Sequence, residues 1–229
     1  MLKTIIDKIY DRYNLKTFKK EDDVVFKFID SIKRTKSNIN YLEVGSGLCR
    51  FALIIRERYS HITVKGIEIN QDLVNLGIKK GLDVVQGSVE KMDFSDQEFD
   101  LIHCSHVIEH LNYEAITNSL DELLRILKPN GYLVIRSPLQ YPGFYFDLDH
   151  IRPYPPEAIL NYFGNDQQQR IGSSRISEIA RWYRREAVTF FNSSHFLIKA
   201  LNIFFKIAWL GLSFPRSKPN GYVFILKKL

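Results

Sequence analysis

Residues 41–52 are Tyr41-Leu42-Glu43-Val44-Gly45-Ser46-Gly47-Leu48-Cys49-Arg50-Phe51-Ala52. A short apolar run ends at the acid Glu43, two glycines follow with one residue between them, and a helix-compatible segment begins at Phe51. This order of strand, glycine turn and helix lets the backbone approach a nucleotide-like ligand at a helix N-terminus. A dinucleotide fingerprint would need a further glycine at the position of Arg50, so the pattern disfavours a nicotinamide cofactor.

Apolar runs after the glycine turn predict four more strands. They cover residues 64–69, 82–86, 99–104 and 132–135, with helix-compatible segments between them. Glu68 lies at the end of the first of these runs. In a nucleotide-binding α/β fold, an acid at that place accepts hydrogen bonds from ribose hydroxyls.

These pieces together resemble, in order and spacing, the class I methyltransferases that use S-adenosylmethionine, in particular the small-molecule, ubiquinone-biosynthesis-like group. The resemblance covers residues 39–160 and includes the phrase His-Val-Ile-Glu-His at 106–110. Two positions depart from the family pattern: Cys49 stands where a third glycine is expected, and Ser88 where an aspartate usually contacts adenine. The resemblance implies a Rossmann-like α/β fold with a seven-stranded, mostly parallel sheet and an antiparallel last strand.

The resemblance also implies a binding site for S-adenosyl-L-methionine at the carboxyl ends of the strands. We expect Glu68 on the ribose and Ser88 beside the adenine, where a serine hydroxyl bonds less strongly than a carboxylate. The expected cofactor-binding residues are Glu43, Gly45, Ser46, Gly47, Glu68, Ile69, Gly87, Ser88, Val89, Cys104, Ser105 and His106. We expect no metal ligands.

The length of 229 residues suits one methyltransferase domain. We divide it into N-terminal helices (1–38), a cofactor-binding core (39–164), a helical cap insertion (165–218) and the last strand (219–228). The N-terminal segment is expected to cover the cofactor end of the sheet, because it carries apolar residues at the spacing of a buried helix face, namely Val25, Phe28, Ile29 and Ile32.

The net charge of +6 is concentrated in the C-terminal part of the chain. Residues 170–229 contain 11 Lys and Arg against two acids. Apolar residues at helical spacing predict a helix over 170–185 with its arginines outward, as a solvated face or as a clamp for phosphate or lipid head groups. These arginines are Arg170, Arg175, Arg181, Arg184 and Arg185.

Residues 195–214 are mostly apolar, and their four polar side chains fall within a helical sector of about 60°. Such a stripe disfavours a transmembrane span. It favours a helix that lies in the membrane interface, a lid that covers the acceptor pocket, or a face that forms a homodimer. We therefore expect peripheral membrane contact through 170–214 as one possibility, and consider nucleic acid the weaker candidate for the basic tail.

The two cysteines, Cys49 and Cys104, form no Cys-x-x-Cys motif, and no export signal precedes the core. We expect both thiols to be reduced in a cytoplasmic protein, at the inner face of the membrane if the tail binds lipid.

Catalysis would require an acceptor aligned with the methyl group and, for a hydroxyl acceptor, a base. His110 and His150 are the candidate bases, with a structural role as the alternative for each, and His103 is expected to be only a strand residue. Glu109 is expected either to orient His110 or to cap the helix that follows it, and the second role is slightly favoured. The expected function is methyl transfer to a small-molecule acceptor, a hydroxyl of a sugar or of a lipid-linked intermediate. The alternatives are a catalytically inactive methyltransferase-like scaffold and, less favoured, an NAD-dependent oxidoreductase.

Overall fold

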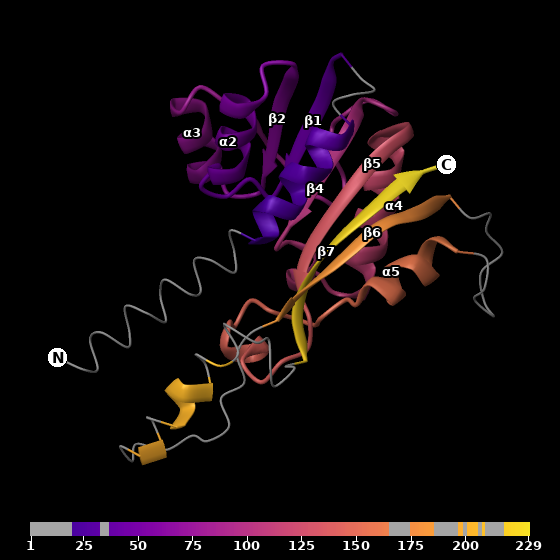
Figure 1. Ribbon diagram of the computed structural model, residues 1–229. Coiled ribbons are helices and arrows are strands. Elements are labelled where there is room, and N and C mark those ends of the chain that lie inside the picture. The colour runs from indigo at the N-terminus through magenta and orange to yellow at the C-terminus, as the bar shows by residue number, and fades with distance from the viewer. Residues whose placement is uncertain are drawn as a thin grey trace.

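The computed structural model describes residues 20–32, 37–164, 175–185, 197–198, 201–205, 208 and 218–229. In these residues a seven-stranded sheet has the order β3-β2-β1-β4-β5-β7-β6 (Figure 1). The strands are β1 (Ile39–Val44), β2 (Ile62–Glu68), β3 (Asp83–Gln86), β4 (Phe99–Ser105), β5 (Leu127–Pro138), β6 (Ile176–Arg185) and β7 (Pro219–Lys228). Strand β7 is antiparallel to both of its neighbours, while β1 to β5 pair in parallel. The expected Rossmann-like sheet is confirmed.

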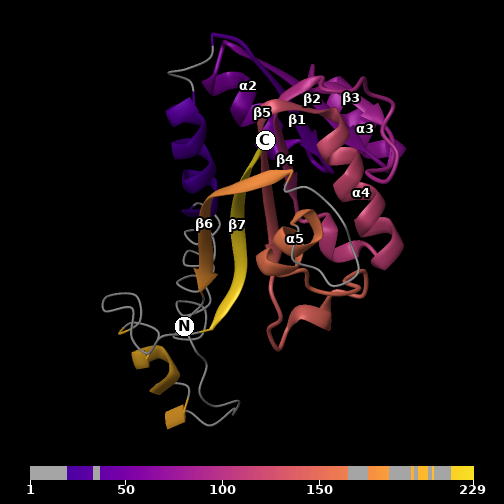
Figure 2. The same ribbon diagram turned by 90° about the vertical axis from the view of Figure 1, so that its right-hand side faces the viewer.

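Helices cover both faces of this sheet. A helix over residues 20–32, called here the N-terminal helix, lies on one side, and α4 and α5 lie on the other (Figure 2). The remaining elements are α2 (Arg50–Arg58), α3 (Gln71–Lys79), α4 (Tyr113–Ile126), α5 (Pro156–Phe163) and two short 3₁₀ helices, η1 (Ile108–His110) and η2 (Phe144–Phe146).

The core divides between the two faces. On one face the N-terminal helix and α2 bury Val25, Ile29 and Ile55 against the strands. On the other face α4 and α5 bury Leu123 and Ile159. The apolar spacing in the N-terminal helix therefore forms the buried face that the sequence predicts.

The strand register aligns the carboxyl ends of β1, β2 and β4. Val44 lies opposite Ile67 of β2 and Cys104 of β4. The loops after these three strands therefore open at one edge of the sheet, which is the usual ligand-binding edge of a parallel α/β sheet.

The helix predicted over 170–185 is wrong for its described part, because Ile176–Arg185 is strand β6. It pairs with β7, and a register shift between Glu178 and Ala180 interrupts the alternation of its side chains. The apolar residues at helical spacing therefore do not share one buried face, and Ile179 is exposed. The insertion at 165–218 is thus not wholly helical; helical residues in its described part are 197–198, 201–205 and 208.

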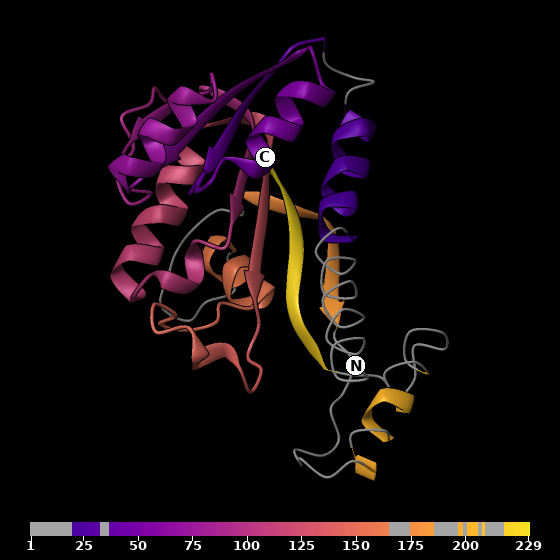
Figure 3. The same cartoon turned by 90° about the vertical axis from the view of Figure 1, so that its left-hand side faces the viewer.

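The predicted outward arginine face is also wrong at two positions. Arg184 is buried, donates to Asn220 and has its guanidinium 3.5 Å from the carboxylate of Glu21 in the N-terminal helix. Arg181 is ion-paired with Glu178 and Glu157. The N-terminal helix accordingly runs alongside β6 and β7 (Figure 3). Arg170 lies outside the described residues.

Most of residues 195–214 also lies outside the described residues. Among those described, Leu197, Leu201 and Phe204 are exposed. In the described parts of the chain, no helix has the length and apolar character needed to cross a bilayer.

Candidate active site

The two glycines after β1 have different physical reasons for being glycine. Gly45 has φ +67°, and a Cβ there would lie 2.4 Å from Cγ2 of Val107. Gly47 has φ +49°, and the atom nearest to a Cβ there would be the Gly45 carbonyl oxygen at 4.0 Å. Gly45 is therefore required by packing and conformation. Gly47 is required by conformation, and the space beside it is open to a ligand.

Cys49 adopts the left-handed conformation with φ 60° at the N-cap of α2. This conformation is unfavourable for a side chain and favourable for glycine. The departure from the glycine of the resembled motif therefore leaves the backbone shape intact and replaces a glycine by a buried thiol.

Glu68 connects the glycine turn to the loop after β2. Its carboxylate accepts hydrogen bonds from the backbone N–H of Gly47 at 2.8 Å and of Asn70 at 3.1 Å. A carboxylate has about four acceptor positions, so two remain for other donors. Ile69, the next residue, is 70% exposed and presents an apolar surface at the same edge.

The loop after β3 forms the next side of this edge. The N–H of Gly87 donates to the Glu68 carbonyl oxygen at 3.0 Å, and a Cβ at Gly87 would lie 2.8 Å from Ile67. The Ser88 hydroxyl accepts from the N–H of Glu90 at 3.2 Å, which leaves its own proton free to donate.

Five of the expected cofactor residues have buried side chains, namely Glu43, Ser46, Glu68, Val89 and Cys104. Of these, Glu68 lies at the edge of the sheet with free acceptor positions on its carboxylate. Burial also raises the pKa of the Cys104 thiol well above its usual range. Ser105 is half-buried, and His106 is exposed with φ +57°.

Glu43 faces the interior beneath α2. Both of its carboxylate oxygens lie 3.0 Å from Nδ1 of His103, and the hydroxyl of Tyr41 donates to the same carboxylate. All three side chains are buried, and burial together with the negative charge of Glu43 raises the pKa of Tyr41. His103 is therefore a strand residue, as expected. Its partner follows from the register, in which Glu43 lies directly opposite His103.

A second buried charge cluster fastens the N-terminal helix beside the glycine turn. Arg136 at the end of β5 donates to Asp22 at 2.9 Å and to Glu21 at 2.8 Å. Asp22 also accepts from Arg50, the first residue of α2, at 2.7 Å. The described part of the N-terminal segment thus lies at the edge where the glycine turn opens. Sequence reasoning did not find this cluster, because Arg136 lies more than 100 positions after Glu21 and Asp22.

Glu109 does not cap the next helix, which was the favoured of its two expected roles. The side chain of Asn112 caps α4 by accepting from the N–H of Ala115. The Glu109 carboxylate is fully buried and lies 3.0 Å from Nδ1 of His106, and it accepts from the Ser137 hydroxyl at 3.2 Å.

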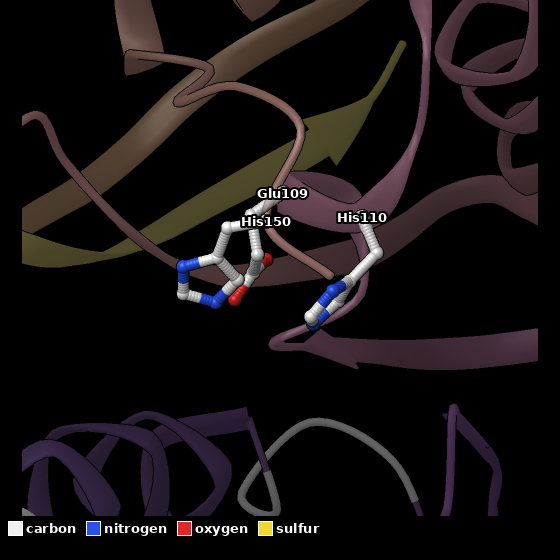
Figure 4. A group of neighbouring side chains, drawn as sticks. All are labelled: Glu109, His110 and His150. Atoms are coloured by element: carbon white, nitrogen blue, oxygen red, sulfur yellow. The ribbon is translucent and has the colours of Figure 1, made fainter. Parts of the chain in front are cut away.

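The structure brings His110 and His150 together beside Glu109 (Figure 4). Their ring centroids are 5.0 Å apart. Nδ1 of His110 lies 3.0 Å from the Asp149 carbonyl oxygen, and Nδ1 of His150 lies 2.7 Å from the Phe144 carbonyl oxygen. A carbonyl oxygen can only accept, so each Nδ1 carries a proton and each neutral ring keeps its lone pair on Nε2.

The loop after β5 forms an open pocket of about 840 Å³ next to these histidines. Its lining residues are Tyr141, Gly143, Phe146, Asp147, Leu148, Asp149 and His150. Phe146 and Leu148 are 87% and 97% exposed, so the pocket offers apolar surface to a ligand.

Comparison with known families matches residues 42–135 to the model described as "Methyltransferase domain". Residues 42–135 therefore match a methyltransferase domain. The matched range contains the glycine turn, Glu68 and the phrase around Glu109 and His110. The match agrees with the methyltransferase resemblance of the sequence, which implies S-adenosyl-L-methionine as the cofactor.

Several curated proteins are similar to part of this chain. An uncharacterised protein of Methanocaldococcus jannaschii is 29% identical over 132 residues, 57% of this chain and 60% of that protein. The fatty-acid O-methyltransferase of Mycolicibacterium smegmatis is 30% identical over 100 residues, 41% of this chain and 35% of that enzyme. The chain therefore spans less than two thirds of the length of these curated relatives.

Solved structures agree with the fold. A SAM-dependent methyltransferase from Archaeoglobus fulgidus superposes with a TM-score of 0.59 at 22% identity, covering 91% of this chain and 94% of that one. The YcgJ protein of Bacillus subtilis gives 0.60 at 15% identity, covering 91% and 97%.

The residues of the methyltransferase domain fit S-adenosylmethionine. The space beside Gly47 is open, Glu68 keeps free acceptor positions for ribose hydroxyls, and Ile69 presents an apolar surface for the adenine. These three features lie at the carboxyl ends of β1 and β2, where α/β folds bind nucleotides.

Proposed function

We propose that this chain transfers a methyl group from S-adenosylmethionine to a hydroxyl oxygen of a small molecule with an apolar part, such as a lipid or a lipid-linked sugar. The observation that supports this most directly is the shared edge of the sheet. It carries Gly47 and Glu68 after β1 and β2, and His110 and His150 in the loops after β4 and β5.

The reaction needs little covalent chemistry from the protein. Bound S-adenosylmethionine supplies an electrophilic sulfonium methyl group. Glu68 and the glycine turn would hold its nucleoside end, while the loop after β5 orients the acceptor. Alignment of two reactants in this way contributes about 7–11 kcal/mol to lowering the barrier.

A hydroxyl acceptor must also lose its proton. Nε2 of His110 and of His150 each keep a lone pair, because each Nδ1 is bonded to a backbone carbonyl oxygen. Either neutral imidazole could therefore accept the proton of the hydroxyl as a general base.

The apolar part of the acceptor is argued from the pocket beside the histidines. Phe146 and Leu148 are largely exposed there, and exposed apolar side chains at a site favour apolar ligands. Two relatives have names that include lipids: the fatty-acid O-methyltransferase, and the phthiotriol/phenolphthiotriol dimycocerosates methyltransferase of Mycobacterium tuberculosis, which is 31% identical over 98 residues.

Peripheral membrane contact remains part of this proposal. It is supported by the exposed apolar side chains of Leu197, Leu201 and Phe204. Co-sedimentation with anionic vesicles should then decrease when these three residues are replaced by serine, and an unchanged bound fraction would count against the contact.

Two measurements test the proposed function. Calorimetric titration should give one S-adenosylmethionine site per chain and no NAD binding. Incubation with methyl-labelled cofactor and fractionated cell extract should then place the label in products that mass spectrometry identifies as methylated at oxygen. Absence of cofactor binding would favour the inactive scaffold, and label confined to polar, non-lipid products would refute the apolar acceptor.

A further inference from the structure

We infer that Glu109, His110 and His150 bind a divalent transition-metal ion such as Zn²⁺ or Co²⁺. One ligand atom from each of these side chains lies within 4.8 Å of the other two (Figure 4). Glu109 and His110 come from η1, directly after β4, and His150 comes from the loop after β5. Two loops that follow neighbouring strands therefore bring the three side chains together.

The histidines are oriented as metal ligands are. A metal-binding histidine usually donates its other ring N–H to a backbone carbonyl or carboxylate, which fixes the ring and leaves a lone pair for the metal. Both rings do this through Nδ1, His110 to the Asp149 carbonyl and His150 to the Phe144 carbonyl. A general base needs only one such ring, so the presence of two argues for a shared cation.

The charges around the cluster also favour a cation. Glu109 is fully buried, and its side-chain partners among the described residues are His106 and the Ser137 hydroxyl. A buried carboxylate is costly without strong compensating charge. A second carboxylate, that of Asp147, has an oxygen 3.7 Å from Nε2 of His150. A divalent ion would compensate both acids.

The ligand types select the class of metal. Imidazole nitrogens suit zinc, copper, iron, cobalt and nickel, whereas Ca²⁺ and Mg²⁺ prefer oxygen ligands. Two histidines and one glutamate are a known ligand set of catalytic zinc sites, in which a further position stays open. Zn–N distances of about 2.0–2.1 Å place tetrahedral ligand atoms about 3.3 Å apart, so the side chains would move inward by at most about 1.5 Å on binding.

The consequence for catalysis rests on the proposed function. The acceptor's hydroxyl oxygen would fill the open position, and the cation would lower the pKa of that hydroxyl so that its proton leaves to solvent. The oxygen then forms a bond to the methyl carbon while the carbon–sulfur bond breaks and its electron pair stays on sulfur. The products are a methyl ether or ester and a neutral thioether, without net oxidation or reduction.

The test measures metal binding separately from catalysis. The untagged, chelator-treated protein is titrated with Co²⁺ and followed by visible absorption, and Zn²⁺ bound after dialysis is measured by elemental analysis. We expect one ion per chain, and at least about 10-fold weaker binding in His110→Gln, His150→Gln and Glu109→Gln. His61→Gln is the matched control, because His61 precedes β2 and lies outside the cluster. Thermal unfolding of each metal-free variant identifies any variant that fails to fold.

The outcomes separate the two proposals. If Co²⁺ and Zn²⁺ bind no better to the wild type than to His150→Gln, the metal site is refuted, whether or not methyl transfer occurs. If the ion binds stoichiometrically but no labelled product forms, the metal site stands and the proposed function fails. Methyl transfer that survives complete chelation would leave the histidines acting as bases and would overturn the metal's role.

Discussion

Replacement of Glu68 by Ala tests two roles of this carboxylate together: binding of the cofactor's ribose and support of the glycine turn. The Glu68 carboxylate accepts two backbone hydrogen bonds, from Gly47 and from Asn70, and is 8% exposed. Hydrogen bonds to charged groups each contribute about 1.5–3 kcal/mol. Both N–H groups lie at an open edge and can be rehydrated in the variant, so we expect a loss near the value of one such bond. For a domain of this size, that loss lowers Tm by roughly 3–12 °C.

The same substitution should also lower the affinity for S-adenosylmethionine. The ribose would lose its hydrogen bonds to the Glu68 carboxylate, again about 1.5–3 kcal/mol, which corresponds to a Kd for S-adenosylmethionine roughly 10- to 140-fold higher. Glu68→Gln keeps one oxygen acceptor and should fall between the wild type and Glu68→Ala in both measurements.

Thermal unfolding and calorimetric titration provide the assay, with Glu57→Ala on the exposed surface of α2 as the matched control. A lower Tm with unchanged cofactor Kd would show that Glu68 supports the glycine turn but does not bind the ribose. An unchanged Tm would refute the assigned contribution of its two backbone hydrogen bonds.

Three further predictions follow from the buried groups. Cys49→Gly should retain cofactor affinity and a Tm within about 5 °C of wild type, because relief of about 1–2 kcal/mol of left-handed strain offsets the lost thiol packing; loss of activity would reveal a role for the thiol. Burial raises the pKa of Cys49 and Cys104 in the folded protein, so their thiols ionise first in the unfolded chain, and stability that is present at neutral pH should be lost as pH rises above about 9. Urea unfolding at pH 7 to 10 checks this, and a rising midpoint would contradict it. Arg184→Gln should lower the free energy of unfolding by about 1.5–3 kcal/mol, because it removes a buried guanidinium that donates to Asn220 and lies beside Glu21, which keeps Arg136 as its other partner. The exposed Arg185→Gln should stay within about 0.5 kcal/mol in the same urea measurement; equal losses would refute the buried role of Arg184.

The parallel half of the fold could be predicted because each of its strands contains apolar or β-branched residues and lies between turn or helix-compatible segments. The apolar run from Tyr41 to Val44 and the glycines after it identify β1 and the cofactor edge without further information. Strand β6 could not be predicted in this way. It lies at the edge of the sheet and contains a register shift at Glu178, so its exposed and buried positions do not alternate.

The candidate site was predicted in part. His110 and His150 were singled out by their positions after strands, and the structure brings them together. The pairing of Glu43 with His103 depends on which residues of two strands lie opposite one another, and a single sequence does not contain that register. The role of Glu109 was missed because an acid shortly before a helix resembles a cap, whereas Asn112 occupies the capping position.

The place of β7 between β5 and β6 affects how the chain can fold during synthesis. About 90 residues separate the end of β5 from the end of β7, which takes a ribosome roughly 4 to 18 s at 5–20 residues per second. Throughout that interval the nascent sheet has an unsatisfied edge at β5, and β6, once it has been made, lacks the strand with which it pairs. During this time the unpaired edge can pair with a wrong strand. Chaperones that hold nascent chains are therefore needed until β7 has paired with β5 and β6.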